Sequence, residues 1–484
     1  MKVANDRIVT IIVGAGKAGT LLAEDIQQRK HSNIDIVGFV DDDPDLVGKK
    51  LAGKVVLGTF DNLPSLIELH GIEELIIAIP SERGAVIRQI IDKTAGHKLS
   101  YKILPRASEV LLQKFSEDYV QHIRKVRPED LLGGEIVKSD QKDVATDIKG
   151  KTVLITGAAG SIGSELSRQI AAYGAKHIIF YDWWENGVFE LRNQLLESHP
   201  KGSYDFIIGD INDRRKLDRI LKQFKPHSVF HAAAYKHVPL MEGNPSEAVK
   251  NNIMGTKNVA ELAIKHGVKK FVLVSTDKAV NPTNVMGATK RAAEKVIHIL
   301  SQAQSSTTFC AVRFGNVINS NGSAIPFFLK QIEKGGPVTV THRDVTRFFM
   351  TIPEAVHLIL RAWTIGENND LFVLDMGESV KIYDLARTLI ALEGYIPEEE
   401  IEIAITGLRP GEKLYEEVLM GQEDLNATAI NKVFRTKNYM SFDKATFQVH
   451  MYELFDMLED EDLTADLVRG QLQQMISTYK PARH

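Results

Sequence analysis

Residues 152–164 read Thr-Val-Leu-Ile-Thr-Gly-Ala-Ala-Gly-Ser-Ile-Gly-Ser. The first five form the apolar, β-branched run of a buried strand, and a helical pattern begins at Ser164. A glycine turn between a strand and a helix lets the backbone approach a pyrophosphate, which the helix N-terminus then attracts. Asp182 ends the next predicted strand, 25 residues beyond Gly157, where such folds place an acid on a ribose. The stretch therefore predicts a dinucleotide site, against the alternative that its glycines only allow tight helix packing.

The same order of elements occurs earlier in the chain. Residues 8–13 form a β-branched apolar run that ends in a turn containing Gly14, Gly16 and Gly19, followed by a helical pattern. A second strand over residues 34–40 ends at Asp41. This first domain either binds a nucleotide or similar effector, or is structural and positions the second domain.

Alternating strands and helices of these lengths predict an α/β chain with two Rossmann-like, doubly wound parallel-sheet domains. After the polar stretch 138–149, further strands are expected over 177–181, 205–208, 228–230, 271–274 and 309–312. Beyond Gly322 the pattern loosens, as in a smaller C-terminal substrate-binding lobe. The expected domains are therefore an N-terminal Rossmann-like domain over 1–140, a catalytic domain over 147–440 and a helical tail over 441–484. Residues 459–462 of the tail form a solvated turn.

Composition excludes several classes of protein. Of the 484 residues 44% are hydrophobic and 25% charged, which excludes a disordered, collagen-like or fibrous chain. With 59 basic and 63 acidic residues the net charge is -4, so no nucleic-acid partner is expected. The single cysteine, Cys310, can form neither an internal disulfide nor a thiolate zinc site; no metal is expected, and a reducing compartment is indicated.

The N-terminus runs directly into a predicted strand and lacks the apolar stretch of a signal peptide or membrane anchor. We therefore expect a soluble, cytoplasmic chain. If a longer natural protein carries membrane helices before Met1, we expect this part of it to lie at the cytoplasmic face of the inner membrane.

A cluster of reactive side chains follows the strand over 271–274. Thr276, Asp277 and Lys278 come at its C-terminal end, where doubly wound folds place their chemistry. In the helix that follows, Met286 and Lys290 are four residues apart and share one face, which in this layout would look at a nicotinamide. Taken singly, Asp277 could cap a turn and the two lysines could be solvated.

Six segments together resemble a known family. They are residues 156–163, 231–239, 275–290, 313–317, 344–350 and 407–413. These segments look like those of the nucleotide-sugar 4,6-dehydratases of the extended short-chain dehydrogenase/reductase superfamily, most of all the large bacterial polysaccharide-biosynthesis members that act on UDP-N-acetylglucosamine. Those members carry an extra N-terminal Rossmann-like domain, so the resemblance covers nearly the whole chain. Two departures are visible in the sequence as given. The large members usually have membrane helices before the first domain, which this sequence does not contain. Met286 stands where the superfamily has a tyrosine, and a methionine at this position is itself typical of the large members.

The resemblance implies a lyase that removes water from UDP-N-acetylglucosamine to give the UDP-4-keto-6-deoxy-N-acetylhexosamine, for capsule, exopolysaccharide or other glycan synthesis. NAD would take a hydride from carbon 4 and return it to carbon 6. By the same resemblance Lys278 removes the carbon 5 proton and Asp277 protonates the departing hydroxyl. Thr276 would hydrogen-bond the carbon 4 hydroxyl, and Lys290 would hold the nicotinamide ribose. A lysine is a base only when neutral, which burial or a neighbouring cation such as Lys290 would favour.

The resemblance also assigns binding residues. The expected NAD contacts are Gly157, Gly160, Ser161, Ile162, Gly163, Asp182, Asp210, Ile211, Ala232, Ala233, Ala234 and Lys290. The expected UDP-sugar contacts are Asn316, Arg347 and Arg409 on the diphosphate, Glu412 on the uridine ribose, and Lys236 and His237 near the sugar. For the two arginines the alternative is a surface salt bridge. The pair Trp183 and Trp184 is expected near the adenine or at the surface.

Two other functions remain open at this stage. A nucleotide-sugar 4-epimerase, here acting on a UDP-N-acetylhexosamine, shares the hydride step but does not need Asp277 and Lys278 to expel water. A non-catalytic nucleotide-sensing protein would turn over no UDP-sugar. With Met286 unable to exchange protons, retention of configuration at carbon 5 is expected, and the group that deprotonates the carbon 4 hydroxyl is left open. We also expect a homo-oligomer, a dimer or larger.

Overall fold

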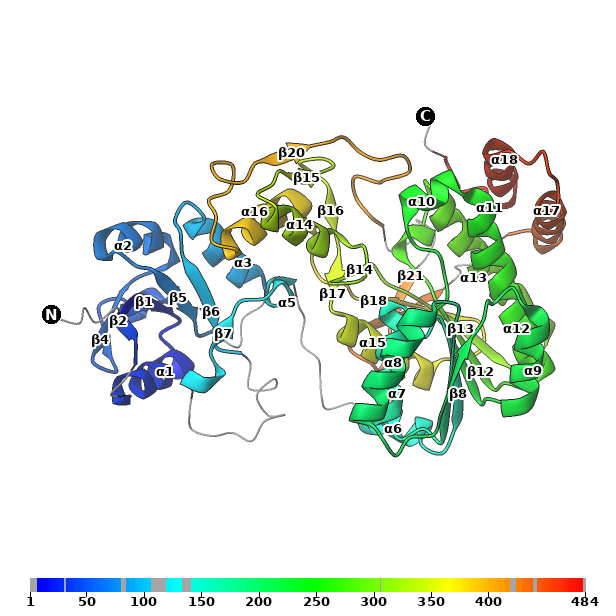
Figure 1. Ribbon diagram of the computed structural model, residues 1–484, viewed down its shortest axis with the longest axis horizontal. Coiled ribbons are helices and arrows are strands. Elements are labelled where there is room, and N and C mark those ends of the chain that lie inside the picture. The colour runs from blue at the N-terminus through cyan, green and yellow to red at the C-terminus, as the bar shows by residue number, and fades with distance from the viewer. Residues whose placement is uncertain are drawn as a thin grey trace. The chain divides into compact units, whose positions relative to one another are not determined.

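The computed structural model describes residues 7–29, 32–79, 84–105, 119–132, 141–304, 306–417, 424–437 and 442–481. Internal contacts divide the chain into two compact units (Figure 1), and each is described by itself. Unit 1 comprises Met1–Gly134, Ser323–Asp344 and Lys381–Thr406. Unit 2 comprises Glu135–Gly322, Val345–Val380 and Gly407–His484.

The first part of unit 1 is a Rossmann-like layer. Its sheet has the strand order β3-β4-β2-β1-β5-β6-β7, in which β3 and β7 are antiparallel edges and the other strands run parallel. The strands are β1 Ile8–Val13, β2 Ile34–Val40, β3 Lys50–Leu51, β4 Lys54–Gly58, β5 Glu74–Ile77, β6 Ser100–Ile103 and β7 Arg124–Lys125, and the helices are α1 Lys17–Gln28, α2 Leu63–His70, α3 Gly84–Thr94 and α5 Pro128–Leu132. The predicted strands over 8–13 and 34–40 are confirmed.

Two later segments complete unit 1. They contain α14 Ala324–Glu333, β15 Val338–Val340, α16 Ile382–Leu392 and β20 Ile403–Ile405. Helix α16 packs against α3, and at this contact Thr388 Oγ1 donates a 2.8 Å hydrogen bond to Asp92 Oδ1. Lys98 Nζ and Glu400 Oε1 form an ion pair of 2.6 Å. Part of the predicted lobe is therefore packed with the N-terminal layer, so these units cut across the expected boundaries 1–140 and 147–440.

Unit 2 is built on one long sheet with the strand order β10-β9-β8-β11-β12-β13-β18-β22-β21. The strands from β10 to β18 run parallel, and β22 and β21 add antiparallel. The order reverses between β8 and β11, which is where open α/β sheets bind ligands. The strands are β8 Thr152–Thr156, β9 His177–Asp182, β10 Tyr204–Ile208, β11 Ser228–His231, β12 Lys270–Val274, β13 Thr308–Arg313, β18 Asp370–Leu374, β21 Asp424–Ala427 and β22 Val433–Lys437.

The expectation that everything beyond Gly322 belongs to a lobe is wrong for three strands. Strand β18 pairs with β13 and extends the parallel sheet. Its residues 371–374 are all apolar and buried, as is required of a strand that is covered on both faces. Strands β22 and β21 then add a hairpin to β18. Short strands β14 Asn316–Val317, β16 Thr346–Arg347, β17 Phe349–Met350 and β19 Val380–Lys381 lie outside this sheet.

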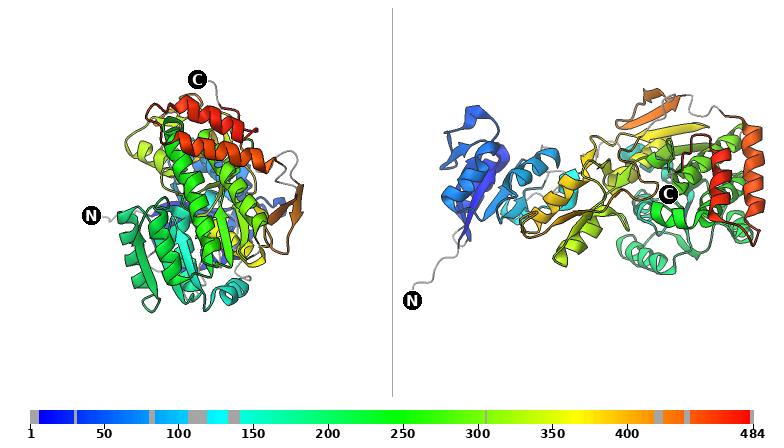
Figure 2. Two further views of the ribbon diagram at one scale, coloured as in Figure 1. Left: turned by 90° about the vertical axis from the view of Figure 1, so that its right-hand side faces the viewer. Right: turned by 90° about the horizontal axis from the view of Figure 1, so that it is seen from above.

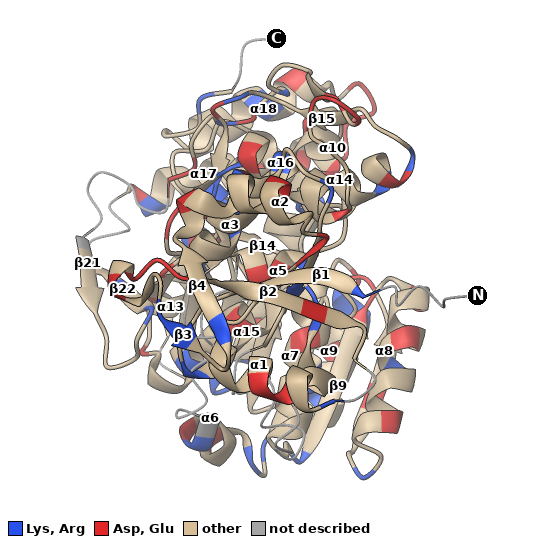
Figure 3. Cartoon of the chain, turned by 90° about the vertical axis from the view of Figure 1, so that its left-hand side faces the viewer, with Lys and Arg blue, Asp and Glu red and all other residues tan. Residues whose placement is uncertain are grey.

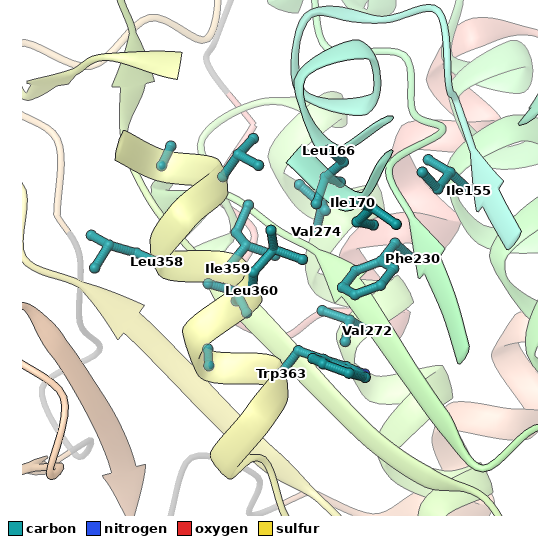
Figure 4. Close-up of a cluster of buried hydrophobic side chains, with 14 of the residues drawn as sticks. Ile155, Leu166, Ile170, Phe230, Val272, Val274, Leu358, Ile359, Leu360 and Trp363 are labelled. Atoms are coloured by element: carbon teal, nitrogen blue, oxygen red, sulfur yellow. The ribbon is translucent and has the colours of Figure 1, made fainter. Parts of the chain in front are cut away.

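Helices cover both faces of the unit 2 sheet, as a parallel sheet needs. One face carries α6 Gln141–Ile148, α7 Ser161–Ala172, α8 Glu185–Ser198 and α15 Ile352–Ile365. Figure 4 shows part of this core, where Ile359 and Trp363 of α15 lie on the side of Phe230 and Val272 of the sheet. The opposite face carries α9 Arg214–Phe224, α12 Thr256–Lys265 and α13 Val285–Ala303.

Helix α6 occupies most of the polar stretch 138–149, in which no helix was predicted. Its Val144 and Ile148 are four residues apart, share one face and are fully buried against α15. Two apolar positions were too few to predict a helix in an otherwise charged segment. The residues 133–140 before it lie outside the described part of the chain.

The predicted helical tail is confirmed. Helices α17 Lys444–Met457 and α18 Ala465–Met475 lie side by side in both views of Figure 2, and residues 459–462 between them are exposed. Helix α18 packs on α11 Pro245–Ala248 and α13. Phe447, Leu454 and Leu472 of the tail join a buried cluster with Met286 and Ala292 of α13. The tail therefore buries the outer side of the helix that carries Met286 and Lys290.

Charges of both signs are interspersed along the elements in Figure 3, in keeping with a net charge of -4. Cys310 is buried and unpaired. Among the described residues, no helix combines the length and the apolar character that crossing a membrane requires.

Candidate active site

The three residues that follow β12 form a connected cluster. Thr276 caps the single turn Asp277–Ala279, and its Oγ1 donates a 2.9 Å hydrogen bond to Asp277 Oδ1. Lys278 Nζ donates to the same carboxylate oxygen and to Asn316 Oδ1 of β14, each over 3.0 Å. Asp277 is 1% exposed, and its Oδ2 has no hydrogen-bond partner among the described residues. The sequence-predicted acid and base are thus brought into direct contact, with Asn316, a predicted diphosphate contact, beside them.

Lys278 carries a positive charge in this arrangement. Burial by itself lowers the pKa of Lys278, but the negative charges of Asp277 and Glu416 outweigh burial, and the net result is a raised pKa. Glu416 Oε1 lies 3.5 Å from Lys278 Nζ. The expectation that burial and Lys290 would favour a neutral Lys278 is therefore wrong, because two carboxylates lie beside the amine and Arg347, not Lys290, is the cation that acts on it.

Helix α13 starts directly against this turn. Asn284 Oδ1 accepts a 2.7 Å hydrogen bond from Gly287 N at the helix N-terminus. A Cβ atom on Gly287 would lie 2.2 Å from the Lys278 carbonyl oxygen, so only glycine allows this approach. Met286 in the first turn of α13 and Lys290 one turn later are both buried. Lys290 Nζ donates to the Val274 carbonyl over 2.7 Å, and burial, opposed by Glu294, lowers its pKa to about 8.

A buried ionic network that we did not predict holds the turn and the helix together. Glu294 accepts hydrogen bonds from Ser275 Oγ at 2.6 Å and from Arg313 Nε at 2.7 Å, and Arg291 pairs with it at 2.9 Å. Burial opposes ionisation of Glu294, but the two arginines and Ser275 lower its pKa to about 2. A signal was present, because Glu294 follows Lys290 by four residues on the same helix face.

The predicted cofactor loop has the shape that a dinucleotide needs. Gly157 has a φ of +69°, and a Cβ atom there would lie 2.5 Å from Ala233 N, so the loop and the Ala232–Ala234 segment are in contact. Helix α7 begins at Ser161, so Ser161, Ile162 and Gly163 form its first turn, where backbone amides lack partners within the helix. Asp182 Oδ2 accepts a 2.9 Å hydrogen bond from Ala159 N, which ties the acid to the loop.

The remaining predicted cofactor residues border the same end of the sheet. Tyr181 Oη donates to the Asp210 carbonyl over 2.8 Å, and Ile211 is buried against Gly255 of the π-helical segment Val249–Gly255. Trp183 and Trp184 are 62% and 39% exposed, so both lie at the surface. The residues present therefore fit a dinucleotide in loop geometry, in acid placement and in the open helix N-terminus.

The loop of unit 1 repeats the arrangement. Asp41 Oδ2 accepts a 2.6 Å hydrogen bond from Ala15 N, and Asp41 Oδ1 accepts one of 3.0 Å from Asp43 N. In unit 2, Asp182 makes the matching pair of bonds with Ala159 N and Trp184 N. The two loops are thus closely alike in geometry.

The predicted sugar-nucleotide residues other than Asn316 fall into two groups: Arg347, Arg409 and Glu412, which are linked by hydrogen bonds, and Lys236 with His237. Arg347 is buried and its Nη2 donates a 2.9 Å hydrogen bond to Glu412 Oε1, so this pair is not a surface salt bridge. Glu412 Oε2 also accepts from Arg409 N over 3.2 Å, while the Arg409 side chain is exposed. Lys236 is exposed as a whole residue, but its amine is partly withdrawn from water. This desolvation, and to a smaller extent repulsion from Lys278, lowers the pKa of Lys236. His237 is half-buried next to Gly322.

Hydrogen bonds fix the segment that carries Glu412 and Glu416 beside the cluster. Thr283 Oγ1 and Asn284 Nδ2 donate to the Gly411 carbonyl over 2.8 and 3.0 Å. Lys413 Nζ donates to the Val280 carbonyl over 2.8 Å. Glu416 is the site residue that sequence reasoning missed, because this stretch has neither helical nor strand periodicity to show which of its carboxylates faces inward.

The parallel sheet, the glycine loop at its switch point and the cluster after β12 define an α/β protein with a Rossmann-type fold. Residues 153–438 match the family described as "Polysaccharide biosynthesis protein", and residues 2–105 match the family described as "CoA-binding domain". Since the first match covers more than half of the chain, this chain belongs to the polysaccharide biosynthesis protein family.

Individual relatives agree with this assignment. The "Probable polysaccharide biosynthesis protein EpsC" of Bacillus subtilis (strain 168) is 48% identical over 414 residues, which cover 85% of this chain and 68% of that protein. The "UDP-glucose 4-epimerase" of Rickettsia canadensis (strain McKiel) is 37% identical over 291 residues, covering 59% of this chain and 82% of that protein. The solved "X-ray structure of Pen from Bacillus thuringiensis" is 35% identical with a TM-score of 0.55, covering 61% of this chain and 90% of that chain.

Proposed function

We propose that this chain is an NAD-dependent nucleotide-sugar 4,6-dehydratase that converts UDP-N-acetylglucosamine to the UDP-4-keto-6-deoxy-N-acetylhexosamine with loss of water. The observation that carries the proposal is the contact of Thr276, Asp277 and Lys278 at the carboxyl end of β12, with Asn316 beside them. An acid and an amine in contact are what elimination of water requires, since one group must protonate the leaving hydroxyl and another must take a carbon-bound proton.

When bound, NAD supplies the reversible acceptance of a hydride, from carbon 4 and then to carbon 6. The chain's own residues move the protons. Thr276 Oγ1 donates to Asp277 Oδ1, so a proton leaving the carbon 4 hydroxyl can pass through Thr276 to Asp277. Asp277 then gives this proton to the carbon 6 hydroxyl, which departs as water. Met286 is buried and its thioether neither donates nor accepts usefully, so it takes no part in these transfers.

Lys278 removes the proton from carbon 5 and returns it to the same face, which retains the configuration. Elsewhere in the site, the glycine loop and Asp182 would hold the cofactor, and Lys290 would hold its nicotinamide ribose. For the substrate, Asn316, Arg347 and Arg409 would bind the diphosphate, Glu412 the uridine ribose, and Lys236 and His237 would lie near the sugar. A guanidinium suits a diphosphate because it offers paired donors and a permanent charge.

The test is to incubate the purified protein with UDP-N-acetylglucosamine in deuterated water and to follow the product by mass spectrometry and proton coupling constants. The proposal expects loss of one water and a 4-keto-6-deoxy product with the carbon 5 configuration of the substrate. A primary product of inverted, arabino configuration would overturn the assignment of both transfers to Lys278.

A 4-epimerase is the second candidate, favoured by the relative from Rickettsia canadensis. It would give an isomer of unchanged mass in the same experiment. Absence of turnover with any UDP-sugar, despite bound NAD, would instead indicate a nucleotide-sensing protein.

A further inference from the structure

Glu416 is a buried carboxylate with no role assigned so far. Its side chain is 4% exposed, and its Oε1 lies 3.5 Å from Lys278 Nζ and 3.8 Å from Arg347 Nε. Its other oxygen, Oε2, is buried and has no hydrogen-bond partner among the described residues. A carboxylate oxygen without a partner is costly to bury, so its retention needs a reason.

The surroundings of Lys278 show what is missing from the reaction scheme. An ammonium group has three hydrogens to donate, and Lys278 Nζ donates two of them, to Asp277 and Asn316. Among the described residues its third oxygen neighbour is Glu416 Oε1, at 3.5 Å. As a cation, the amine has no lone pair for a carbon-bound proton. Before Lys278 can act as a base, one of its protons must move to another group.

Only two of the three neighbours are bases. The Asn316 amide oxygen does not take up a proton at neutral pH, and Asp277 is already needed to receive the proton of the carbon 4 hydroxyl. Glu416 remains, with an unoccupied oxygen. We propose that Glu416 accepts the proton that Lys278 must lose, so that Glu416 acts through Lys278 as the residue that switches it to its basic form. This inference rests on the proposed dehydratase function.

Arg347 gives the transfer its timing. The Arg347 guanidinium lies between Glu412, at 2.9 Å, and Glu416, at 3.8 Å. A bound diphosphate competes for this guanidinium, and a carboxylate that loses a neighbouring cation becomes more basic. Substrate binding thus favours breaking one N–H bond of Lys278 and forming an O–H bond on Glu416. After Lys278 has taken and returned the carbon 5 proton, Glu416 gives its proton back, and the protons balance.

The test compares Glu416→Gln with Glu417→Gln, a matched change at the adjacent position. Glu417 is half-exposed and accepts a 2.7 Å hydrogen bond from Asn281 Nδ2, away from Lys278. The glutamine at 416 keeps the size of the side chain but cannot take a proton. At pH 7 we expect dehydration to fall ~100-fold in Glu416→Gln, with NAD content and UDP binding unchanged, and to stay near the wild-type rate in Glu417→Gln.

The pH profile separates a proton acceptor from a structural residue. The charged groups around Lys278 are Asp277, Glu416, Arg347 and Lys236. Without the 416 carboxylate, Lys278 must lose its proton to water, so the rate of Glu416→Gln should rise about tenfold per pH unit while that of the wild type does not. A wild-type rate at pH 7, or an equal loss at every pH, would overturn the inference. If the wild type and Glu417→Gln also fail to dehydrate, the proposed function itself is wrong, and the inference falls with it.

Discussion

At the scale of single residues, the proposed dehydratase function assigns proton transfer to Asp277 and Lys278, which are in contact, and assigns neither of them to binding the diphosphate. We expect Lys278→Ala and Asp277→Asn each to lose roughly 100-fold or more of the dehydration rate, the loss typical of removing a general acid or base. UDP binding by calorimetry should be retained. Lys265→Ala, which changes a mostly exposed lysine on α12, serves as the control and should keep the wild-type rate. Near wild-type turnover in either site variant would remove the assignment.

Asp182 carries the prediction on cofactor choice. Its carboxylate is fixed by the amides of Ala159 and Trp184, so it stays at the end of β9 beside the glycine loop. A carboxylate there accepts hydrogen bonds from ribose hydroxyls and repels a 2′-phosphate, so NAD should be preferred over NADP. Extraction of the cofactor from denatured protein, followed by chromatography, measures this directly. Mainly NADP in the extract would show that Asp182 does not face the ribose.

Single residues also show how far sequence reasoning reaches. Thr276, Asp277 and Lys278 could be predicted because they are adjacent in sequence and end a recognisable strand. The charge of Lys278 could not be predicted, because it depends on Glu416 and Asn316, which two distant segments bring to the same amine. A pKa is set by neighbours in space, and neighbours from irregular stretches leave no periodic signal.

At the scale of elements, the strands and helices of both glycine loops were predictable, whereas α6 and β18 were not. Each glycine loop lies between a strand and a helix, and this fixed order is visible in the sequence. Helix α6 has only Val144 and Ile148 as apolar anchors, and β18 follows a loop-rich segment that resembles a lobe. Such elements are fixed by packing against α15 and β13 rather than by their own pattern.

Helix α13 and the tail give a prediction at this scale. Lys295 of α13 is 7% exposed, with Nζ 4.5 Å from the ring centroid of Phe442 and 5.3 Å from that of Phe447. Burial, aided by Arg291, lowers the pKa of Lys295 to about 8. An unfolded lysine titrates near ~10.4, so between these values the unfolded chain holds more protons, and folding becomes more stable as pH rises.

In Lys295→Met the side chain at this position does not titrate, so its contribution to the free energy of unfolding does not change with pH. The stability of the variant relative to wild type should therefore decline between about pH 8 and ~10.4, by at most about 1.4 kcal/mol per pH unit. Below pH 8 the difference should be constant. Thermal unfolding of both proteins at pH 7, 8, 9 and 10 measures it, with Lys265→Met as the exposed control. Parallel curves for Lys295→Met and wild type would mean that Lys295 keeps an ordinary pKa.

At the scale of the whole molecule, the residues assigned to chemistry belong to one unit, whereas two segments inserted between them in the sequence belong to the other unit. Every assigned site residue belongs to unit 2, although the sequence of that unit is interrupted by the segments 323–344 and 381–406. Those two segments pack with the N-terminal layer, through α16 on α3 and the Thr388–Asp92 hydrogen bond. The N-terminal layer should therefore matter for the stability of these segments and not for the proton transfers.

A fragment that begins at Asp147 tests this division. We expect it to keep bound cofactor and to dehydrate the substrate, because the assigned residues all lie at or beyond Gly157, but to melt at a lower temperature, because α16 loses its contact with α3. Thr388→Val in the full chain is the milder control. It removes one hydrogen bond to the partly buried Asp92, whose pKa burial already raises, and should cost ~1–3 kcal/mol without changing the rate. A folded fragment with full cofactor content and no turnover would show that the N-terminal layer completes the active site.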